Sequence, residues 1–273
     1  MKNLKLAAVC LSCLTMTGCS ALNFSVEGLI NAPKLTSEQS EIHQALIESV
    51  GSNITLKYPK NGEYRSAYVI ANIDDESADE AMVFYEYTSN GSEEDGLRVN
   101  ILDKDEDGKW YSVKELAGAG TDIDQVIISP MGSNNQTDVF VGYQNLTNDE
   151  KTMEIYSYTD GDFKRVALDT YSVLEPLDIN NDGYIELITI QRSTNNDTGA
   201  VTAKASMLNM KNDEITRGEN VDMCDNVTSY VSSKTGMLDS GRRAIFIDGL
   251  TADGKLQTEI IYYRYSGLQN PMQ

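Results

Sequence analysis

The sequence predicts a mainly β fold: a β-propeller-like array of about four four-stranded blades, preceded by one N-terminal helix. Three observations predict this class. From residue 53 onward, short runs of β-branched and aromatic residues alternate with loops rich in Asp, Asn and Gly, as strands and turns do. Only one segment has strong helical periodicity. An acidic loop with apolar flanks recurs along the chain, and units of roughly 50 residues match the size of a propeller blade.

The first residues have the parts of a secretory signal peptide, which we assign to 1–18. Lys2 and Lys5 form a short positive region, and an apolar run follows at 6–14. That run is too short to span a membrane as a helix, which needs about 20 residues. The segment Met16-Thr17-Gly18-Cys19 resembles the bacterial lipobox, with methionine where leucine is usual. The resemblance implies that Cys19 is the lipid-acceptor residue; the alternative is an ordinary signal peptide with an incidental cysteine.

Lipidation at Cys19 would place the protein at the cell membrane, on its extracytoplasmic face. Two or more acyl chains anchor a protein stably, whereas a single chain is marginal. Residues 19–35 have no clear periodicity and are expected to form a lipidated tether. No later stretch approaches 18 consecutive apolar residues, so the lipid is the predicted contact with the membrane.

The charge balance excludes one class of partner. The chain has 42 acidic and 22 basic residues, for a net charge of −20. Nucleic acid would be repelled by such a surface, so no nucleic-acid partner is expected. An acidic surface suits calcium binding and also plain solubility. Of the 4 cysteines only Cys224 lies beyond residue 19, so an internal disulfide is not expected, and a buried or half-buried thiol is favoured over a nucleophile.

The predicted N-terminal helix occupies 36–52. Thr36 and Gln39 have the spacing of a capping box. Apolar residues then recur at helical spacing, and Gly51 supplies a stop signal. His43, the single histidine, lies one step off the apolar stripe and is expected to be exposed.

The predicted β-propeller-like repeat domain occupies 53–273. Strands are expected within 54–58, 67–70, 81–85, 97–102, 126–128, 138–143, 153–158, 187–190, 244–247 and 259–263. Repeat units are expected to start near residues 67, 123, 173 and 243, and the last would break off within a blade. The array would then be truncated, closed by other means, or open.

Two loops reveal the repeat. Residues 71–82 align with 177–188 without a gap, and Asp, Glu or Asn occupy the first, third, fifth and ninth loop positions in both. The sequence Asp-x-Asn-x-Asp-Gly-x-x-Glu at 178–186 resembles FG-GAP/VCBS repeats, the integrin-α-like propeller repeats of bacterial surface proteins. The resemblance implies a β-propeller fold. The resemblance extends over the β region in its arrangement of strands and loops. One loop matches the repeat pattern well, and a second matches it in degenerate form.

Calcium is the cofactor that this pattern suggests. Calcium takes six to eight oxygen ligands, and alternate residues of a tight loop can converge on one point. The resemblance assigns ligands to the same positions, with the backbone carbonyl of Tyr184 among them: Asp178, Asn180, Asp182, Tyr184 and Glu186. The weaker first loop offers Asn72, Asp74, Glu76 and Glu80, with Ser77 in place of the glycine. The alternative is a polar turn whose side chains cap their own backbone.

The sequence predicts no enzyme. A Ser-His-Asp triad would have to use His43, a His-based zinc site has too few ligands, and no nucleotide-binding glycine motif is present. The favoured hypothesis is a non-catalytic binding or scaffold module that presents loops to an unknown protein or glycan. One alternative is a carbohydrate-active propeller hydrolase with an Asp/Glu pair about 5–10 Å apart in a central funnel. Another is a truncated paralogue without independent function.

Overall fold

The computed structural model describes residues 35–88, 96–130, 137–145, 150–195, 197–211, 214–218, 220–225 and 227–272. The predicted signal peptide at 1–18, the lipidation site Cys19 and the tether up to residue 34 lie outside the described residues. The chain divides into two compact units, Met1–Ser40 and Glu41–Gln273. All described strands belong to the second unit.

Helix α2 (Ser37–Val50) forms as its sequence predicts. The backbone N–H of Gln39 donates to Oγ1 of Thr36 at 3.1 Å, and the Thr36 N–H donates to Oε1 of Gln39 at 3.1 Å. This reciprocal pair is the predicted capping box. Gly51 then ends the helix with a positive φ of 86°, a conformation that glycine adopts without strain.

His43 is half-buried, which corrects the expectation that it is exposed. Its Nδ1 lies 2.8 Å from the hydroxyl oxygen of Tyr68, and the two rings meet edge to face. The buried face of the helix is therefore wider than its apolar residues alone indicate, because the contact between His43 and Tyr68 extends it. Ile42, Ala45 and Leu46 form the buried part of that stripe.

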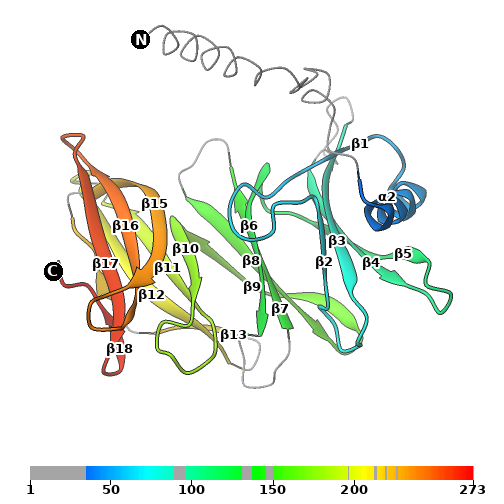
Figure 1. Cartoon of the computed structure of the whole chain (residues 1–273). Coiled ribbons are helices and arrows are strands. Elements are labelled where there is room, and N and C mark those ends of the chain that lie inside the picture. The colour runs from blue at the N-terminus through cyan, green and yellow to red at the C-terminus, as the bar shows by residue number, and fades with distance from the viewer. Residues whose placement is uncertain are drawn as a thin grey trace, which may run out of the picture. The chain divides into compact units, whose positions relative to one another are not determined.

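The described strands form four sheets, and each strand pairing among them is antiparallel. The first sheet contains β1 (Ile54–Leu56), β2 (Tyr68–Ala71), β3 (Glu80–Tyr87), β4 (Leu97–Lys104) and β5 (Trp110–Ala117). The second contains β6 (Asp122–Pro130), β7 (Thr137–Gln144), β8 (Lys151–Thr159) and β9 (Asp162–Tyr171). The third contains β10 (Val173–Leu177), β11 (Glu186–Thr194), β12 (Val201–Lys211), β13 (Glu214–Arg217) and β14 (Val221–Asp222). The fourth contains β15 (Val227–Met237), β16 (Arg243–Thr251), β17 (Leu256–Arg264) and β18 (Gly267–Gln269), and Figure 1 shows the sheets follow the chain in order.

The mainly β class with one N-terminal helix is confirmed, but the last repeat unit was misplaced. The fourth sheet starts at Val227, whereas residue 243 begins its second strand. The expectation of an interrupted last unit was also wrong, because the fourth sheet has a full set of four strands. The physical reason is β15, where polar residues outnumber apolar ones and most positions are exposed or half-buried. Such a strand lacks the apolar run on which the prediction depended.

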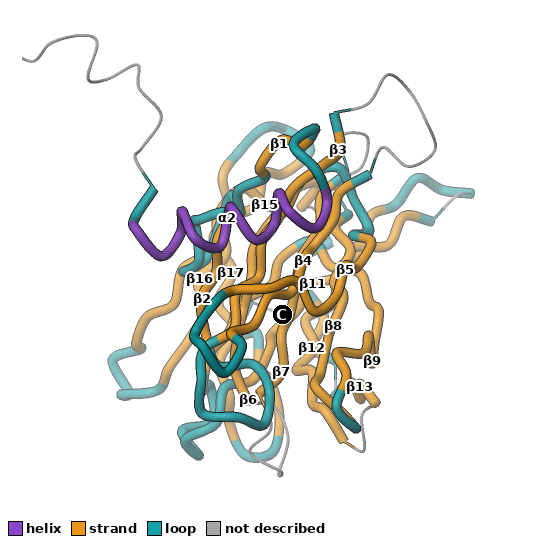
Figure 2. Tube along the Cα trace, turned by 90° about the vertical axis from the view of Figure 1, so that its right-hand side faces the viewer, coloured by secondary structure: helices purple, strands orange, loops and turns teal. Residues whose placement is uncertain are grey.

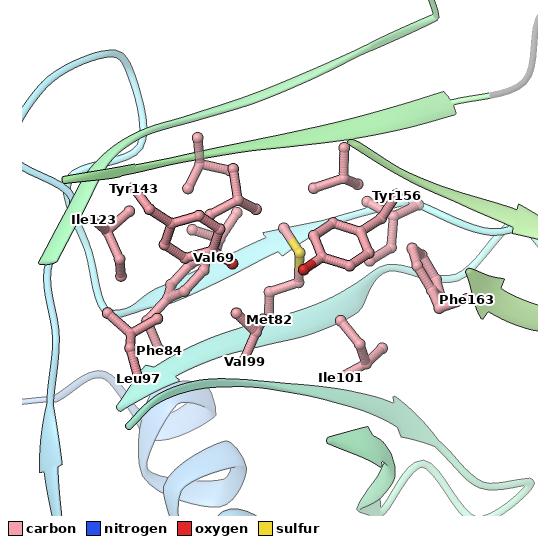
Figure 3. Close-up of a cluster of buried hydrophobic side chains, with 14 residues drawn as sticks. Val69, Met82, Phe84, Leu97, Val99, Ile101, Ile123, Tyr143, Tyr156 and Phe163 are labelled. Atoms are coloured by element: carbon pink, nitrogen blue, oxygen red, sulfur yellow. The ribbon is translucent and has the colours of Figure 1, made fainter. Parts of the chain in front are cut away.

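The core consists of apolar layers between consecutive sheets. One cluster joins the first sheet to the second and contains Met82, Phe84 and Tyr143 (Figure 3). A second cluster joins β7 and β8 to β10, β11 and β12, and a third joins the third sheet to the fourth. Consecutive sheets therefore bury the faces that they turn toward each other.

Helix α2 covers the remaining face of the first sheet. Ala81, Val83 and Tyr85 belong to the cluster that contains the helix, whereas Met82 and Phe84 face the second sheet. Side chains alternate between the two faces of a strand, so α2 and the second sheet lie on opposite faces of β3. Figure 2 shows α2 across the strands of the first sheet. None of the helices in the described residues is long and apolar enough to cross a membrane.

Candidate functional site

A cleft lies along the first strands of the second, third and fourth sheets. It has a volume of about 640 Å³, and residues of β6, β10 and β15 form its walls together with the segment 61–64. Small-molecule sites fall in the range of about 300–1,000 Å³. Three segments far apart in sequence thus form one hollow of ligand size.

Asp124 on β6 is the buried acid of this cleft, with 1 % of its surface exposed. Its Oδ1 accepts from Nζ of Lys151 at 2.8 Å and from Nδ2 of Asn61 at 2.8 Å. Its Oδ2 accepts from the hydroxyl of Tyr171 at 2.7 Å. A buried carboxylate needs a counter-charge and hydrogen-bond donors, and Asp124 has both. Burial, followed by the charge of Asp124, holds the pKa of Tyr171 well above its ordinary value, so its hydroxyl stays a donor.

Polar contacts also join the first strands to one another. Nε2 of Gln125 on β6 donates to the carbonyl oxygen of Leu174 on β10 at 3.0 Å. The hydroxyl of Ser233 on β15 donates to Oε1 of Glu175 on β10. Burial raises the pKa of Glu175, and the bond from Ser233 opposes that shift. These contacts fix three neighbouring strands at the walls of the cleft.

The structure brings together the four polar side chains predicted for the loop at 178–186. Nδ2 of Asn180 donates to Oδ2 of Asp182 at 2.9 Å and to Oε1 of Glu186 at 2.8 Å. Asp178 accepts from the backbone N–H of Asp182 at 3.1 Å, and an Arg243 nitrogen lies 3.0 Å from its Oδ2. Tyr184, by contrast, has an exposed side chain, and its backbone N–H donates to Oδ1 of Asp182 at 2.9 Å.

Glu186 is the buried acid of this loop, with 7 % of its surface exposed. Its Oε2 accepts from the backbone N–H of Ile179 at 3.0 Å. Burial is the largest cause that raises the pKa of Glu186 to about 7, and the charges of Asp182 and Asp178 add to it. The Ile179 bond opposes the shift because it favours the charged carboxylate.

The first loop has the same frame but a looser set of side chains. The N–H of Ile73 donates to Oε2 of Glu80 at 2.8 Å, and Asp74 accepts from the N–H of Glu76 at 2.7 Å. The Asn72 amide donates to the carbonyl oxygen of Glu76 at 2.7 Å, so it serves the turn itself. Burial is the largest cause that raises the pKa of Glu80 to about 7, with the charges of Asp74 and Asp103 adding to it.

The described residues contain no group of three or more His, Cys, Asp or Glu side chains positioned to hold a metal ion. In the loop at 178–186, Asn180 presents its amide nitrogen to the carboxylates. A cation at this point needs the amide turned, so that Oδ1 replaces Nδ2. The calcium assignments in both loops therefore remain predictions.

Sequence reasoning missed the cleft and Asp124. The available signal was an Asp-Gln pair between Ile123 and the apolar run at 126–128. A charged residue in such a run is expected to be buried with partners. Its partners come from residues 61, 151 and 171, and no local pattern links these positions. Cys224, in contrast, is half-buried as expected, and burial followed by Glu259 raises its pKa to about 11.

Comparison with known proteins assigns no family to these sites. No protein-family model matches the chain, and no curated protein matches it.

Proposed function

We propose that this chain is a membrane-anchored extracytoplasmic lipoprotein whose β body is a non-catalytic binding module, with a glycan as the ligand of the cleft. The observation that carries the binding role is the 640 Å³ cleft along the first strands of the second, third and fourth sheets. Its walls combine amide and hydroxyl side chains with aromatic rings: Asn61, Tyr64, Gln125, Ser172 and Tyr230. Hydroxyl-rich ligands suit such walls, because the amides and hydroxyls both donate and accept hydrogen bonds.

The state of Asp124 favours binding over catalysis. A nucleophile or general base must reach a substrate atom at hydrogen-bond distance. Asp124 is buried, and its oxygens already accept from Lys151, Asn61 and Tyr171. These bonds give Asp124 a structural role as the anchor of the cleft wall. A glycosidase needs two acids that can reach the substrate, and Asp124 is not available as one of them.

We also infer that the four sheets are blades of an open propeller-like array, with α2 as a cap on its first blade. The support is the burial of β3 and of β7 on both faces, whereas β16 alternates between buried and half-buried positions. A repeat at the end of an array needs a cap with a polar outer face. Helix α2 supplies one, because its outward positions include Glu41, Gln44 and Glu48.

Calcium at the loop 178–186 belongs to this proposal as a stiffening element. The donors are all oxygen: the side chains of Asp178, Asp182 and Glu186, with Oδ1 of Asn180 after its amide turns. A bound divalent cation would hold the turn between β10 and β11 and favour the charged form of Glu186. The loop already orients one of these donors, because the backbone N–H of Ile179 holds the Glu186 carboxylate.

Metabolic labelling tests the anchor. Bacteria that express the full chain are fed an alkynyl palmitate, and the label is detected on the purified protein. We expect label on the wild-type protein and none on Cys19→Ala, because the thiol is the attachment point. Cys13→Ala is the matched control and should keep the label. Equal labelling of wild type and Cys19→Ala would refute the anchor.

A glycan array tests the cleft with the full chain in a non-ionic detergent. Val231→Arg places a long side chain at a cleft position that is 53 % exposed, so the fold should tolerate it. Met237→Arg on the same strand is the control, since Met237 is 68 % exposed and does not line the cleft. We expect a glycan signal that Val231→Arg lowers at least tenfold and Met237→Arg leaves intact. Equal binding by both variants would exclude the cleft, and release of reducing sugar from the bound glycan would favour the hydrolase.

A further inference from the structure

A second cavity, of about 220 Å³, is lined by residues of the first and second sheets and of the first repeat loop. Carboxylates and aromatic rings form much of its lining: Asp74, Glu80, Asp103, Tyr111, Tyr158 and Phe163. Ile101 and Phe163, which lie at the same end of the buried cluster in Figure 3, also border it. The cavity is separate from the cleft and shares no lining residue with it.

Glu80 has an unsatisfied oxygen at this cavity. Only 2 % of the residue is exposed. Its Oε2 accepts the bond from Ile73, but its Oε1 is buried without a hydrogen-bond partner. An acceptor left unpaired in the interior costs about 1–3 kcal/mol, and more when it is charged. Within the part of the chain that the structure describes, Oε1 can therefore accept a hydrogen bond from a bound donor.

The second repeat loop shows which donor is missing. There, Nδ2 of Asn180 donates to Oε1 of Glu186. The residue aligned with Asn180 in the first loop is Asp74, whose carboxylate has no N–H to donate. The change from amide to carboxylate both removes the donor from Glu80 and adds a negative charge beside it.

Counter-charge is missing as well. Arg243 pairs with Asp178 in the second loop. Among the described residues, no Lys or Arg forms an ion pair with Asp74, Glu80 or Asp103. Lys114 borders the cavity, but its Nζ already donates to Oδ1 of Asp162 at 2.6 Å and to the carbonyl oxygen of Phe163. Asp178 is aligned with the neutral Asn72, so the first loop differs in where its charges lie. It lacks the amide that completes the second loop, and its acids Asp74 and Glu80 have no ion-pair partner among the described residues.

We propose that this cavity binds a primary ammonium group, which donates to Oε1 of Glu80 and is neutralised by Asp74 and Asp103. An ammonium carries three N–H donors and a positive charge, so it replaces both missing groups at once. Tyr111, Tyr158 and Phe163 supply rings for contact with the cation and its aliphatic stem. A divalent cation fits less well, because the amide of Asn72, one of its predicted ligands, already donates to the carbonyl oxygen of Glu76.

Saturation-transfer-difference NMR with n-butylammonium chloride tests the proposal on the full chain in detergent at low ionic strength. We expect saturable binding with a dissociation constant of about 1 mM or tighter. Tetramethylammonium should bind at least tenfold more weakly, because it has no N–H to donate. Spermidine and an acetylated, amidated Gly-Gly-Lys-Gly-Gly peptide then distinguish a free polyamine from a protein lysine as the source of the group.

Variants locate the binding. Asp74→Asn restores the donor that Asn180 provides in the second loop and should weaken n-butylammonium binding at least tenfold. Glu80→Gln removes the acceptor charge and should weaken binding equally, and circular dichroism should show both variants folded. Asp182→Asn in the second loop is the matched control and should bind as the wild type does. Equal affinity for tetramethylammonium, unchanged binding by Asp74→Asn, or competition by calcium at stoichiometric concentration would each overturn the ammonium site.

Discussion

The backbone N–H of Ile179 donates to Oε2 of Glu186 at 3.0 Å, and Ile73 makes the same bond to Glu80 at 2.8 Å. In both loops the donor lies seven residues before the acid. The bond closes each acidic turn and buries the carboxylate at the first residue of β3 or β11. Because burial favours the neutral form, these two acids couple the stability of the turns to pH and to any bound cation.

The first prediction concerns pH. Burial raises the pKa of Glu186 from its ordinary value of 4.5 to about 7 in the folded protein. Between pH 4.5 and pH 7, the native state therefore holds a proton that the unfolded chain has lost. The stabilising contribution is complete below pH 4.5 and is lost as pH rises through 7. In the metal-free protein, Glu186→Gln should remove this loss. The free energy of unfolding of the variant, relative to that of the wild type, should be higher at pH 8 than at pH 5 by about 1–2 kcal/mol after allowance for solvent screening.

Urea unfolding in EDTA at pH 5 and pH 8 measures this effect. Asp197→Asn is the control, because Asp197 is an exposed acid in the turn between β11 and β12. It should leave the pH dependence as it is in the wild type. An identical pH dependence for Glu186→Gln and wild type would show that Glu186 titrates at its ordinary pKa.

The second prediction concerns calcium. A ligand that binds only the native state stabilises it by about 2.7 kcal/mol at a hundredfold excess over its dissociation constant. We expect the thermal midpoint in millimolar calcium to exceed that in EDTA, and the increase to vanish in Asp178→Asn and Glu186→Gln. Differential scanning calorimetry measures the midpoint, with magnesium as the ion control. A midpoint that does not respond to calcium would exclude a structural site at 178–186.

The third prediction concerns the start of α2. Thr36→Ala removes the acceptor of the Gln39 N–H, and loss of such a cap costs about 0.5–2 kcal/mol. The effect should reach global stability because Ile42 and Leu46 are fully buried against the first sheet. The urea midpoint measures it, and Ser37→Ala at an exposed first-turn position is the control. Equal midpoints for the two variants would indicate that the helix is held by packing alone.

Local patterns explain which features the sequence could predict. The capping box of Thr36 and Gln39 is a contact within one turn, and it forms as expected. The repeat placed Glu80 and Glu186 at equivalent positions, and both are buried at strand starts. The capping box and each of the two acidic turns involve residues within ten positions of one another, so local sequence patterns predict them.

Features that depend on distant residues were not predicted. Asp124 receives donors from Asn61, Lys151 and Tyr171, which only the packing of strands brings together. His43 lies beside Tyr68 for the same reason. The contrast between Glu80 and Glu186 depends on one amide in place of one carboxylate, and its effect is visible only once the Asn180 bond is seen.

The last prediction concerns Gly142 on β7, which packs directly against Tyr171. A Cβ built at Gly142 would collide with the hydroxyl oxygen of Tyr171, the same hydroxyl that donates to Asp124. Gly142→Ala should therefore displace the ring and weaken the buried Asp124 cluster, with a loss of about 1–3 kcal/mol typical of overpacking. Urea unfolding measures the loss of stability.

A double-mutant cycle with Tyr171→Phe separates the collision from other effects of the added methyl group. Tyr171→Phe alone should cost about 1–2 kcal/mol, because it removes one donor from the buried Asp124. In that background the hydroxyl is gone, so Gly142→Ala should cost less than it does in the wild type. If Gly142→Ala costs the same in both backgrounds, the glycine is required for strand geometry and not for the approach of Tyr171 to Asp124.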